Sequence, residues 1–182
     1  MVYKPNFMTS GSAHSLYQYL VEAIQWQQPV VRVWGQDHQV PRLQYWMGEV
    51  GQDYQYSGKI FTASEWIPIV KELKQQVERV CQSPFNSVLL NWYRNGEDKM
   101  GWHADNEAEL GTMPSIAMVS LGETRTFQYR HNDNQVTESL EISNGSLLLM
   151  KPGMQSNYQH QVPTRKKISS GRISLTFRNI LK

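Results

Sequence analysis

The sequence predicts an α+β fold in which two N-terminal helices precede a double-stranded β-helix, or jelly-roll, core. Three observations support this prediction. Apolar residues recur at helical spacing in two early segments, short strand-like segments follow one another after residue 86, and turn-forming residues separate these segments. We expect residues 1–182 to form a single domain, because a chain of 182 residues can bury one sizeable core.

Two helices are expected, over residues 10–26 and 64–81. Each carries apolar side chains at helical spacing on one face, and a serine at the start of the first helix can cap it. Ser64 is the expected cap of the second helix, where Pro68 is tolerated because it lies in the first turn. Between the helices, residues 30–60 combine short extended pieces with several glycines.

Seven strands are expected after the second helix. They occupy residues 87–93, 115–121, 125–130, 136–142, 146–150, 157–161 and 171–178. Turn-forming pairs such as Asn95-Gly96 and Pro152-Gly153 divide them. A jelly roll built from such strands has a mouth at one end, where a metal site can lie.

The composition is that of a globular protein from a reducing compartment. Hydrophobic residues make up 40% of the chain, which excludes a disordered protein. Cys81 is the only cysteine, so no intrachain disulfide can form. The net charge of +2 is too small to identify a nucleic-acid binder by charge alone. The sequence shows no signal peptide and no long apolar run, so we expect a soluble monomer in the cytoplasm, nucleus or nucleoid, neither secreted nor attached to a membrane.

Two histidines and an aspartate form a candidate metal site. His103 and Asp105 are two residues apart, so in a strand they point to the same face. His160 comes from a distant strand and completes the set of two imidazoles and one carboxylate that holds iron on one face of an octahedron. Taken alone, the spacing is also compatible with zinc or manganese, or with a chance pair.

The last expected strand carries a column of polar residues. Arg172, Ser174, Thr176 and Arg178 share one face, over a length of about 20 Å, while apolar residues occupy the other face. Two arginines on an inward face require anions, and a guanidinium matches a carboxylate bidentately. A dicarboxylate that chelates the metal and reaches an arginine would satisfy both features. The alternative is a solvated edge strand with ordinary salt bridges.

Asn91 and Tyr93 are a further pair of polar groups that share one face of the expected strand 87–93. The strand is otherwise rich in apolar residues. These side chains can donate hydrogen bonds to a ligand. The alternative is that they are satisfied polar groups at the end of a strand.

Taken together, these motifs resemble the AlkB family of Fe(II)- and 2-oxoglutarate-dependent dioxygenases, most closely the branch of nuclear DNA-repair homologues. The resemblance covers roughly residues 30–181. The family pattern H-x-D…H matches His103, Asp105 and His160, and its N-x-Y pattern matches Asn91 and Tyr93. Its R-x-N-x-T-x-R pattern matches three residues, with serine in place of asparagine: Arg172, Ser174, Thr176 and Arg178.

The resemblance implies an Fe(II) cofactor, 2-oxoglutarate as co-substrate, and O2. Iron would be held by the three metal ligands. Arg172 and Tyr93 would bind the distal carboxylate of 2-oxoglutarate, and Asn91 and Arg178 would lie nearer the metal end. The reaction would hydroxylate a methyl group on a damaged base nitrogen, and the product would release formaldehyde.

The resemblance also implies a nucleotide-recognition lid within residues 30–60 and a catalytic jelly roll over 87–180. The base must be flipped out of a duplex to reach the metal. Candidate substrate-binding residues fall in four places: Trp34, Gly35 and Gln36 as an inserted wedge, Tyr54, Gln55 and Tyr56 lining the base pocket, Asn106 and Glu107 after the metal strand, and Arg42, Arg165, Lys166 and Lys167 at phosphates. Each has a plain alternative, as core aromatics, hairpin residues or solvated polar groups.

The function expected from these features is oxidative demethylation of N-alkylated bases in DNA, of the 1-methyladenine and 3-methylcytosine type. RNA demethylation is a variant within the same enzyme class. Two other classes remain open, a 2-oxoglutarate oxygenase acting on protein or a small molecule, and a nucleic-acid-binding module without catalysis.

Overall fold

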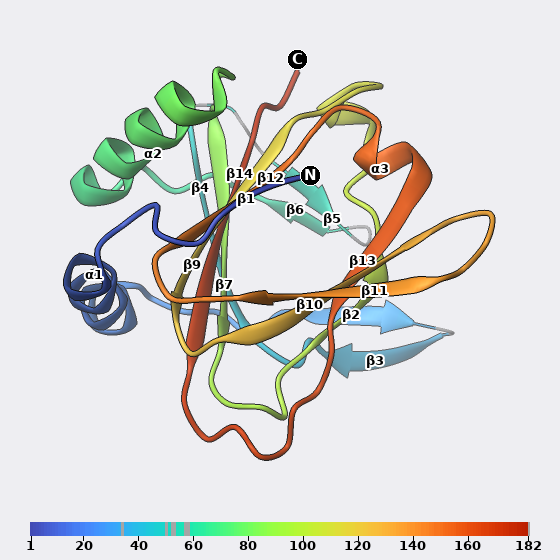
Figure 1. Cartoon of the computed structure of the whole chain (residues 1–182), viewed down its shortest axis with the longest axis horizontal. Helices are drawn as coiled ribbons and strands as arrows, with labels where there is room; N and C mark the ends of the chain where they lie inside the picture. The colour runs from blue at the N-terminus through green and yellow to red at the C-terminus, as the bar shows by residue number, and fades with distance from the viewer. Residues whose placement is uncertain (34, 50, 52–53, 57–58, 182) are drawn as a thin grey trace.

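Two facing antiparallel β-sheets form the core of the computed structural model, which describes residues 1–33, 35–49, 51, 54–56 and 59–181 (Figure 1). The major sheet has six strands in the order β1-β12-β9-β14-β7-β4, and the minor sheet has four in the order β11-β10-β13-β8. The major-sheet strands in that order are Val2–Lys4, Ser146–Met150, Ile116–Gly122, Arg172–Arg178, Ser87–Tyr93 and Leu43–Gly48. The minor-sheet strands are Thr137–Ile142, Arg125–His131, Tyr158–Val162 and Met100–His103. This arrangement confirms the predicted jelly-roll core.

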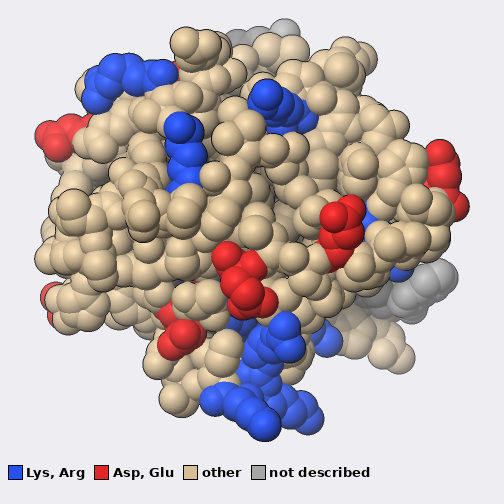
Figure 2. Space-filling view, in the orientation of Figure 1, with Lys and Arg blue, Asp and Glu red and all other residues tan. Residues whose placement is uncertain are grey.

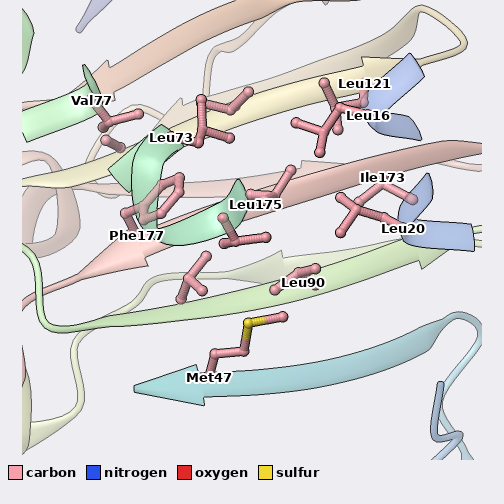
Figure 3. Packing of buried hydrophobic residues seen from close by; sticks show 14 of the residues in the cluster. Leu16, Leu20, Met47, Leu73, Val77, Leu90, Leu121, Ile173, Leu175 and Phe177 are labelled. Carbon is pink, nitrogen blue, oxygen red and sulfur yellow. The ribbon is translucent and has the colours of Figure 1, made fainter. Parts of the chain in front are cut away.

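Helices cover one face of the major sheet. Figure 1 shows α1 (Ser10–Ala23) and α2 (Pro68–Cys81) side by side on that face. Leu16 and Leu20 of α1 and Leu73 and Val77 of α2 point onto the apolar side chains of the sheet (Figure 3). On β14 the residues that join this cluster are Ile173, Leu175 and Phe177, which lie on alternate positions. The other face of β14 therefore points between the two sheets.

The second apolar cluster lies between the sheets. It combines residues of the major sheet with residues of the minor sheet, among them Met118, Leu148, Phe127 and Val162. It includes Leu110 from the short helix η1 (Ala108–Leu110) and Met154 from α3 (Met154–Asn157). Several members of this cluster, among them Met118 and Phe127, also line the pocket described below.

The helix boundaries differ from those predicted. The first helix ends at Ala23, and its N-cap is Thr9, whose Oγ1 accepts a hydrogen bond from the Ser12 backbone N–H. The second begins at Pro68 without a side-chain cap, so the predicted cap at Ser64 is wrong. Ser64 instead forms a bridge with Met47 beside the major sheet. Pro68 supplies the fixed backbone angle that suits the first helical position.

Residues 30–60 contribute both to small separate sheets and to the major sheet. Two separate two-stranded sheets lie here, β2 (Val30–Val33) with β3 (Gln36–Gln39), and β5 (Tyr54–Tyr56) with β6 (Lys59–Phe61). Between them, β4 pairs with β7 along its whole length and belongs to the major sheet. Within this range, the strands that lie outside the two core sheets therefore form two short ribbons, β2-β3 and β5-β6. None of the helices in the described part of the chain has the length and apolar character needed to cross a membrane.

Gly96 sits where two loops touch, and we expect Gly96→Ala to destabilise the protein by about 1–3 kcal/mol. Its N–H donates to the Ile168 carbonyl at 2.8 Å, and its carbonyl accepts from the Arg165 N–H at 2.7 Å. A Cβ at this position would lie 1.8 Å from the Arg165 carbonyl oxygen, so one loop must move. Urea unfolding of the variant measures the loss.

Gly11→Ala is the matched control for this prediction. Gly11 lies in α1, and a Cβ there meets no atom within 4 Å. Alanine also favours the helix, so this variant should be at least as stable as the wild type. An equal loss in both variants would contradict the role given to the loop contact at Gly96.

Candidate functional site

The two predicted histidine ligands lie directly opposite each other on neighbouring strands. His103 ends β8 and pairs in register with His160 of β13. Their rings are 4.2 Å apart between centroids. Asp105 follows two residues later, with its carboxylate oxygens 3.9 Å from the Nε2 atoms of both rings. The ligand atoms of the three residues all lie within 4.8 Å of one another, so they can bind one ion.

Neighbouring groups orient the two imidazoles. His103 Nδ1 lies 2.9 Å from the Gly101 carbonyl oxygen, which can only accept, so Nδ1 carries the hydrogen and Nε2 keeps its lone pair. The ring of His160 stacks on Phe127 at 5.2 Å between centroids. Burial, with a smaller effect of His103, lowers the pKa of His160 to about 3. The His160 imidazole is therefore neutral at neutral pH, which is the form that binds a metal.

Asp105 is held as a buried carboxylate. Its Oδ1 accepts a 2.7 Å hydrogen bond from Arg178 Nη2, and its backbone N–H donates to Gln155 Oε1 at 2.9 Å. Burial by itself would raise the pKa of Asp105, but Arg178 and the two histidines outweigh it and lower the pKa to about 2. The side chain is therefore ionised at neutral pH. Two neutral nitrogens and one carboxylate oxygen fit an Fe(II) site with open positions.

A pocket between the sheets opens from this triad. Its polar lining comes from β14 (Ser174, Thr176, Arg178), from β7 (Asn91, Tyr93), from Gln44 of β4 and from Arg42 just before that strand, together with the triad itself. Apolar side chains, including Trp46, Phe127 and Met150, complete the wall. The polar column of β14 thus faces inward, and all seven residues of this strand are buried. The alternative of a solvated edge strand is excluded by the two neighbours of β14 in the sheet.

Arg172 lies beside Tyr93, at the end of the polar column away from Arg178. Its Nε donates to Ser120 Oγ at 2.7 Å, and its guanidinium lies 5.4 Å from the centre of the Tyr93 ring. Among the described residues, its Nη1 is buried without a hydrogen-bond partner. Burial lowers the pKa of Arg172 to about 10, so the group stays charged at neutral pH. A buried cation with an unused donor fits the carboxylate of a bound anion.

The candidate substrate-binding residues differ in how far the structure describes them and in how exposed they are. Trp34 lies outside the described residues, as do the side chains of Tyr54, Gln55 and Tyr56, whose backbone forms β5. Gly35 and Gln36 are exposed where β3 begins, Asn106 is exposed beside the metal loop, and Glu107 is half-buried. The side chains of Gln36, Asn106 and Glu107 do not line the pocket described above.

Arg42 does not occupy the position expected of a phosphate contact. It is 3% exposed and lines the pocket between the sheets, where a phosphate on the outer surface cannot reach it. By contrast, Arg165, Lys166 and Lys167 are exposed on the loop between β13 and β14. Figure 2 shows basic side chains gathered at the bottom of the view, where Figure 1 has this loop.

Sequence reasoning missed Gln155 and Gln44, which hold other site residues in place. Gln155 lies in a four-residue helix and reaches Asp105, 50 positions earlier. Gln44 of β4 reaches Asn91 on the neighbouring strand β7, 47 positions later. Alternation could have shown that position 44 shares a face with Trp46, which also lines the pocket. No local signal points to Gln155.

In the metal-free protein we expect the free energy of unfolding to fall as the pH drops below 6.5. The unfolded His160 imidazole binds a proton near its ordinary pKa of 6.5, whereas the folded one does so only near 3. The stability it contributes is complete above pH 6.5 and declines by about 1.4 kcal/mol per pH unit below it. Asp105, with its pKa lowered from 3.8 to about 2, adds a further loss only below about pH 4.

Urea unfolding of chelator-treated protein between about pH 7 and pH 5 measures this slope before Asp105 contributes. The His160→Gln variant is the control, because glutamine does not titrate. Its stability should depend less steeply on pH than that of the wild type. Identical slopes in the two proteins would show that His160 is not the titrating group.

The comparisons with known proteins agree with this geometry. Residues 1–178 match the family model described as the 2OG-Fe(II) oxygenase superfamily. The DNA oxidative demethylase ALKBH2 of Homo sapiens is 38% identical over an alignment of 159 residues, which covers 83% of this chain and 61% of that protein. The alpha-ketoglutarate-dependent dioxygenase alkB homolog 3 of Homo sapiens is 34% identical over an alignment of 186 residues with gaps included, which covers 97% of this chain and 64% of that protein. The chain spans about three fifths of the length of these curated relatives.

Solved structures share the fold at lower identity. The structure of OsALKBH1 superposes with a TM-score of 0.70 at 17% identity, covering 98% of this chain and 97% of that one. A prolyl hydroxylase from Trichoplax adhaerens, solved with a hypoxia inducible factor peptide fragment, gives a TM-score of 0.68 at 13% identity, covering 98% of this chain and 82% of that one. Both are evidence for the fold alone.

Proposed function

We propose, from the premise that this chain belongs to the AlkB family of the 2OG-Fe(II) oxygenase superfamily, that it is an oxidative demethylase of N-alkylated bases in DNA. The observation that carries the proposal is the pocket in which the His103, Asp105 and His160 side chains meet buried arginines. A redox-active ion beside a site for an organic diacid is what this chemistry requires.

Fe(II) would be held by His103, Asp105 and His160. When bound, it supplies the oxidising chemistry, in which O2 is consumed, 2-oxoglutarate is decarboxylated to succinate and the N-methyl group is hydroxylated. The hydroxymethyl product then loses formaldehyde and leaves the repaired base. Arg178 keeps the Asp105 carboxylate ionised and oriented, since it donates a 2.7 Å hydrogen bond to one of its oxygens.

2-Oxoglutarate would lie along the polar column of β14. Arg172 and Tyr93 bind its distal carboxylate, and Asn91 and Arg178 act nearer the metal. Thr176 lines the pocket and Ser174 faces Asn91 across the sheet, so both can add hydrogen bonds. The unused Nη1 donor of Arg172 supports this assignment.

The substrate would be alkylated DNA with its damaged base flipped toward the metal. Trp34, Gly35 and Gln36 form the wedge, and Tyr54, Gln55 and Tyr56 line the base pocket. Asn106 and Glu107 contact the base, while the exposed basic loop at Arg165, Lys166 and Lys167 contacts phosphates. The chain acts as a monomeric single domain over 1–182, with its lid within 30–60 and its catalytic core over 87–180. It works where DNA is kept, in the nucleus or nucleoid.

One assay tests the proposal. Formaldehyde and succinate release are measured with Fe(II) and 2-oxoglutarate, using DNA and RNA oligonucleotides that carry 1-methyladenine or 3-methylcytosine. Release from alkylated DNA, and none from unmodified DNA, is the expected result. Release from RNA alone would replace the proposal with RNA demethylation, and binding without turnover would replace it with a binding module.

A further inference from the structure

Asn91 receives two hydrogen bonds on a single oxygen. Its Oδ1 accepts from Arg42 Nε at 2.8 Å and from Gln44 Nε2 at 2.9 Å. All three side chains line the pocket, and all are buried, at 8% exposure for Asn91, 3% for Arg42 and 5% for Gln44. Two donors on one buried acceptor hold the amide far more firmly than one would.

The guanidinium decides which way the amide points. An arginine N–H can only donate, so the atom of Asn91 that faces Arg42 must be the oxygen. The amide Nδ2 is therefore turned to the opposite side. Asn91 lies between Gln44 on β4 and Ser174 on β14 in the sheet register. Because Ser174 has a short side chain, it leaves room for a ligand on the side that Nδ2 faces.

Arg42 itself has no counter-ion among the described residues, where no carboxylate lies within ion-pair distance of it. Its second contact is a long one, from Nη1 to the Lys99 carbonyl at 3.5 Å. Burying a guanidinium without a counter-ion costs folding free energy, so its presence here suggests that it has a function in the site. Holding Asn91 in one orientation is such a function.

We propose that Arg42 and Gln44 are positioning residues that fix Asn91 with its Nδ2 donor turned toward the bound 2-oxoglutarate. The inference rests on the proposed function, in which Asn91 contacts this co-substrate. Neither Arg42 nor Gln44 touches the co-substrate in this scheme. Their removal lets the amide rotate, so the donor is lost even though Asn91 remains.

Calorimetric titration of 2-oxoglutarate into the Mn(II)-loaded protein tests the positioning role of Arg42 and Gln44 without turnover. Arg42→Met and Gln44→Met should each weaken 2-oxoglutarate binding, by up to about tenfold, the value of one hydrogen bond. Asn91→Ala should weaken it similarly. The double variants that combine Asn91→Ala with either substitution should bind no more weakly than Asn91→Ala alone, because the positioning residues act only through Asn91.

Gln28→Met is the matched control. Gln28 Nε2 donates to the Val40 carbonyl at 3.0 Å, at the same edge of the sheet, without contacting Asn91. Its 2-oxoglutarate affinity should stay within twofold of the wild type. Mn(II) affinity and the thermal midpoint are measured for every variant. Gln44→Met removes no charge, so its 2-oxoglutarate affinity still tests the proposal if Arg42→Met fails to fold.

Two results would overturn the inference alone. One is an affinity for 2-oxoglutarate that is unchanged in both Arg42→Met and Gln44→Met. The other is that Arg42→Met or Gln44→Met weakens 2-oxoglutarate binding as much in the Asn91→Ala variant as in the wild type. That result would mean that the substituted residue contacts the ligand directly. Failure of the wild-type protein itself to bind 2-oxoglutarate would instead overturn the proposed function, and the inference with it.

Discussion

His103→Ala is expected to lower formaldehyde release from alkylated DNA by roughly a thousandfold or more while the protein stays folded. The substitution leaves one imidazole and one carboxylate, too few to hold the ion whose chemistry is worth several kcal/mol of barrier. His103 ends the edge strand β8 and is only half-buried, so truncating it opens no large cavity in either apolar cluster. Formaldehyde release, Mn(II) affinity and the thermal midpoint of the metal-free protein are the three measurements.

His14→Ala is the control for this variant. His14 is exposed on α1, away from the pocket lining, so its removal should leave both activity and Mn(II) affinity at wild-type values. Turnover retained by His103→Ala would refute the assignment of this residue as a metal ligand. Loss of turnover together with a collapse of the thermal midpoint would show that His103 is structural.

The strands were predictable because each is bounded by turn residues and shows local alternation. Strands 87–93 and 146–150 have the predicted limits, and the other five are displaced by one residue at one or both ends. The inward face of β14 follows from period two alone. By contrast, β1 and β8 were not predicted as strands, because three or four residues are too few to show a period.

The parts of the site that escaped prediction depend on contacts between distant positions. Arg42 was expected to contact a phosphate, but it is buried and donates a hydrogen bond to Asn91, 49 positions away. Gln155 holds the Asp105 backbone in the same non-local way. Residue type and spacing could indicate which side chains bind the metal, whereas the groups that hold those side chains depend on the tertiary fold.

Arg178→Met is expected to destabilise the metal-free protein by about 3–5 kcal/mol, the cost of leaving a buried charge without its partner. Arg178 and Asp105 are each 4% exposed and joined by a 2.7 Å hydrogen bond. Without the guanidinium, burial of Asp105 would raise its pKa, which Arg178 now opposes more than any other group. Urea unfolding of the chelator-treated variant measures the loss.

The double variant Asp105→Asn with Arg178→Met separates this effect from a general loss of packing. With the carboxylate neutralised, no unpaired charge remains, so the double variant should be more stable than Arg178→Met alone. Mn(II) should also stabilise Arg178→Met more than it stabilises the wild type, because the cation replaces the lost positive charge beside Asp105. A double variant as unstable as the single one would mean that Arg178 acts through the shape of its side chain and not through its charge.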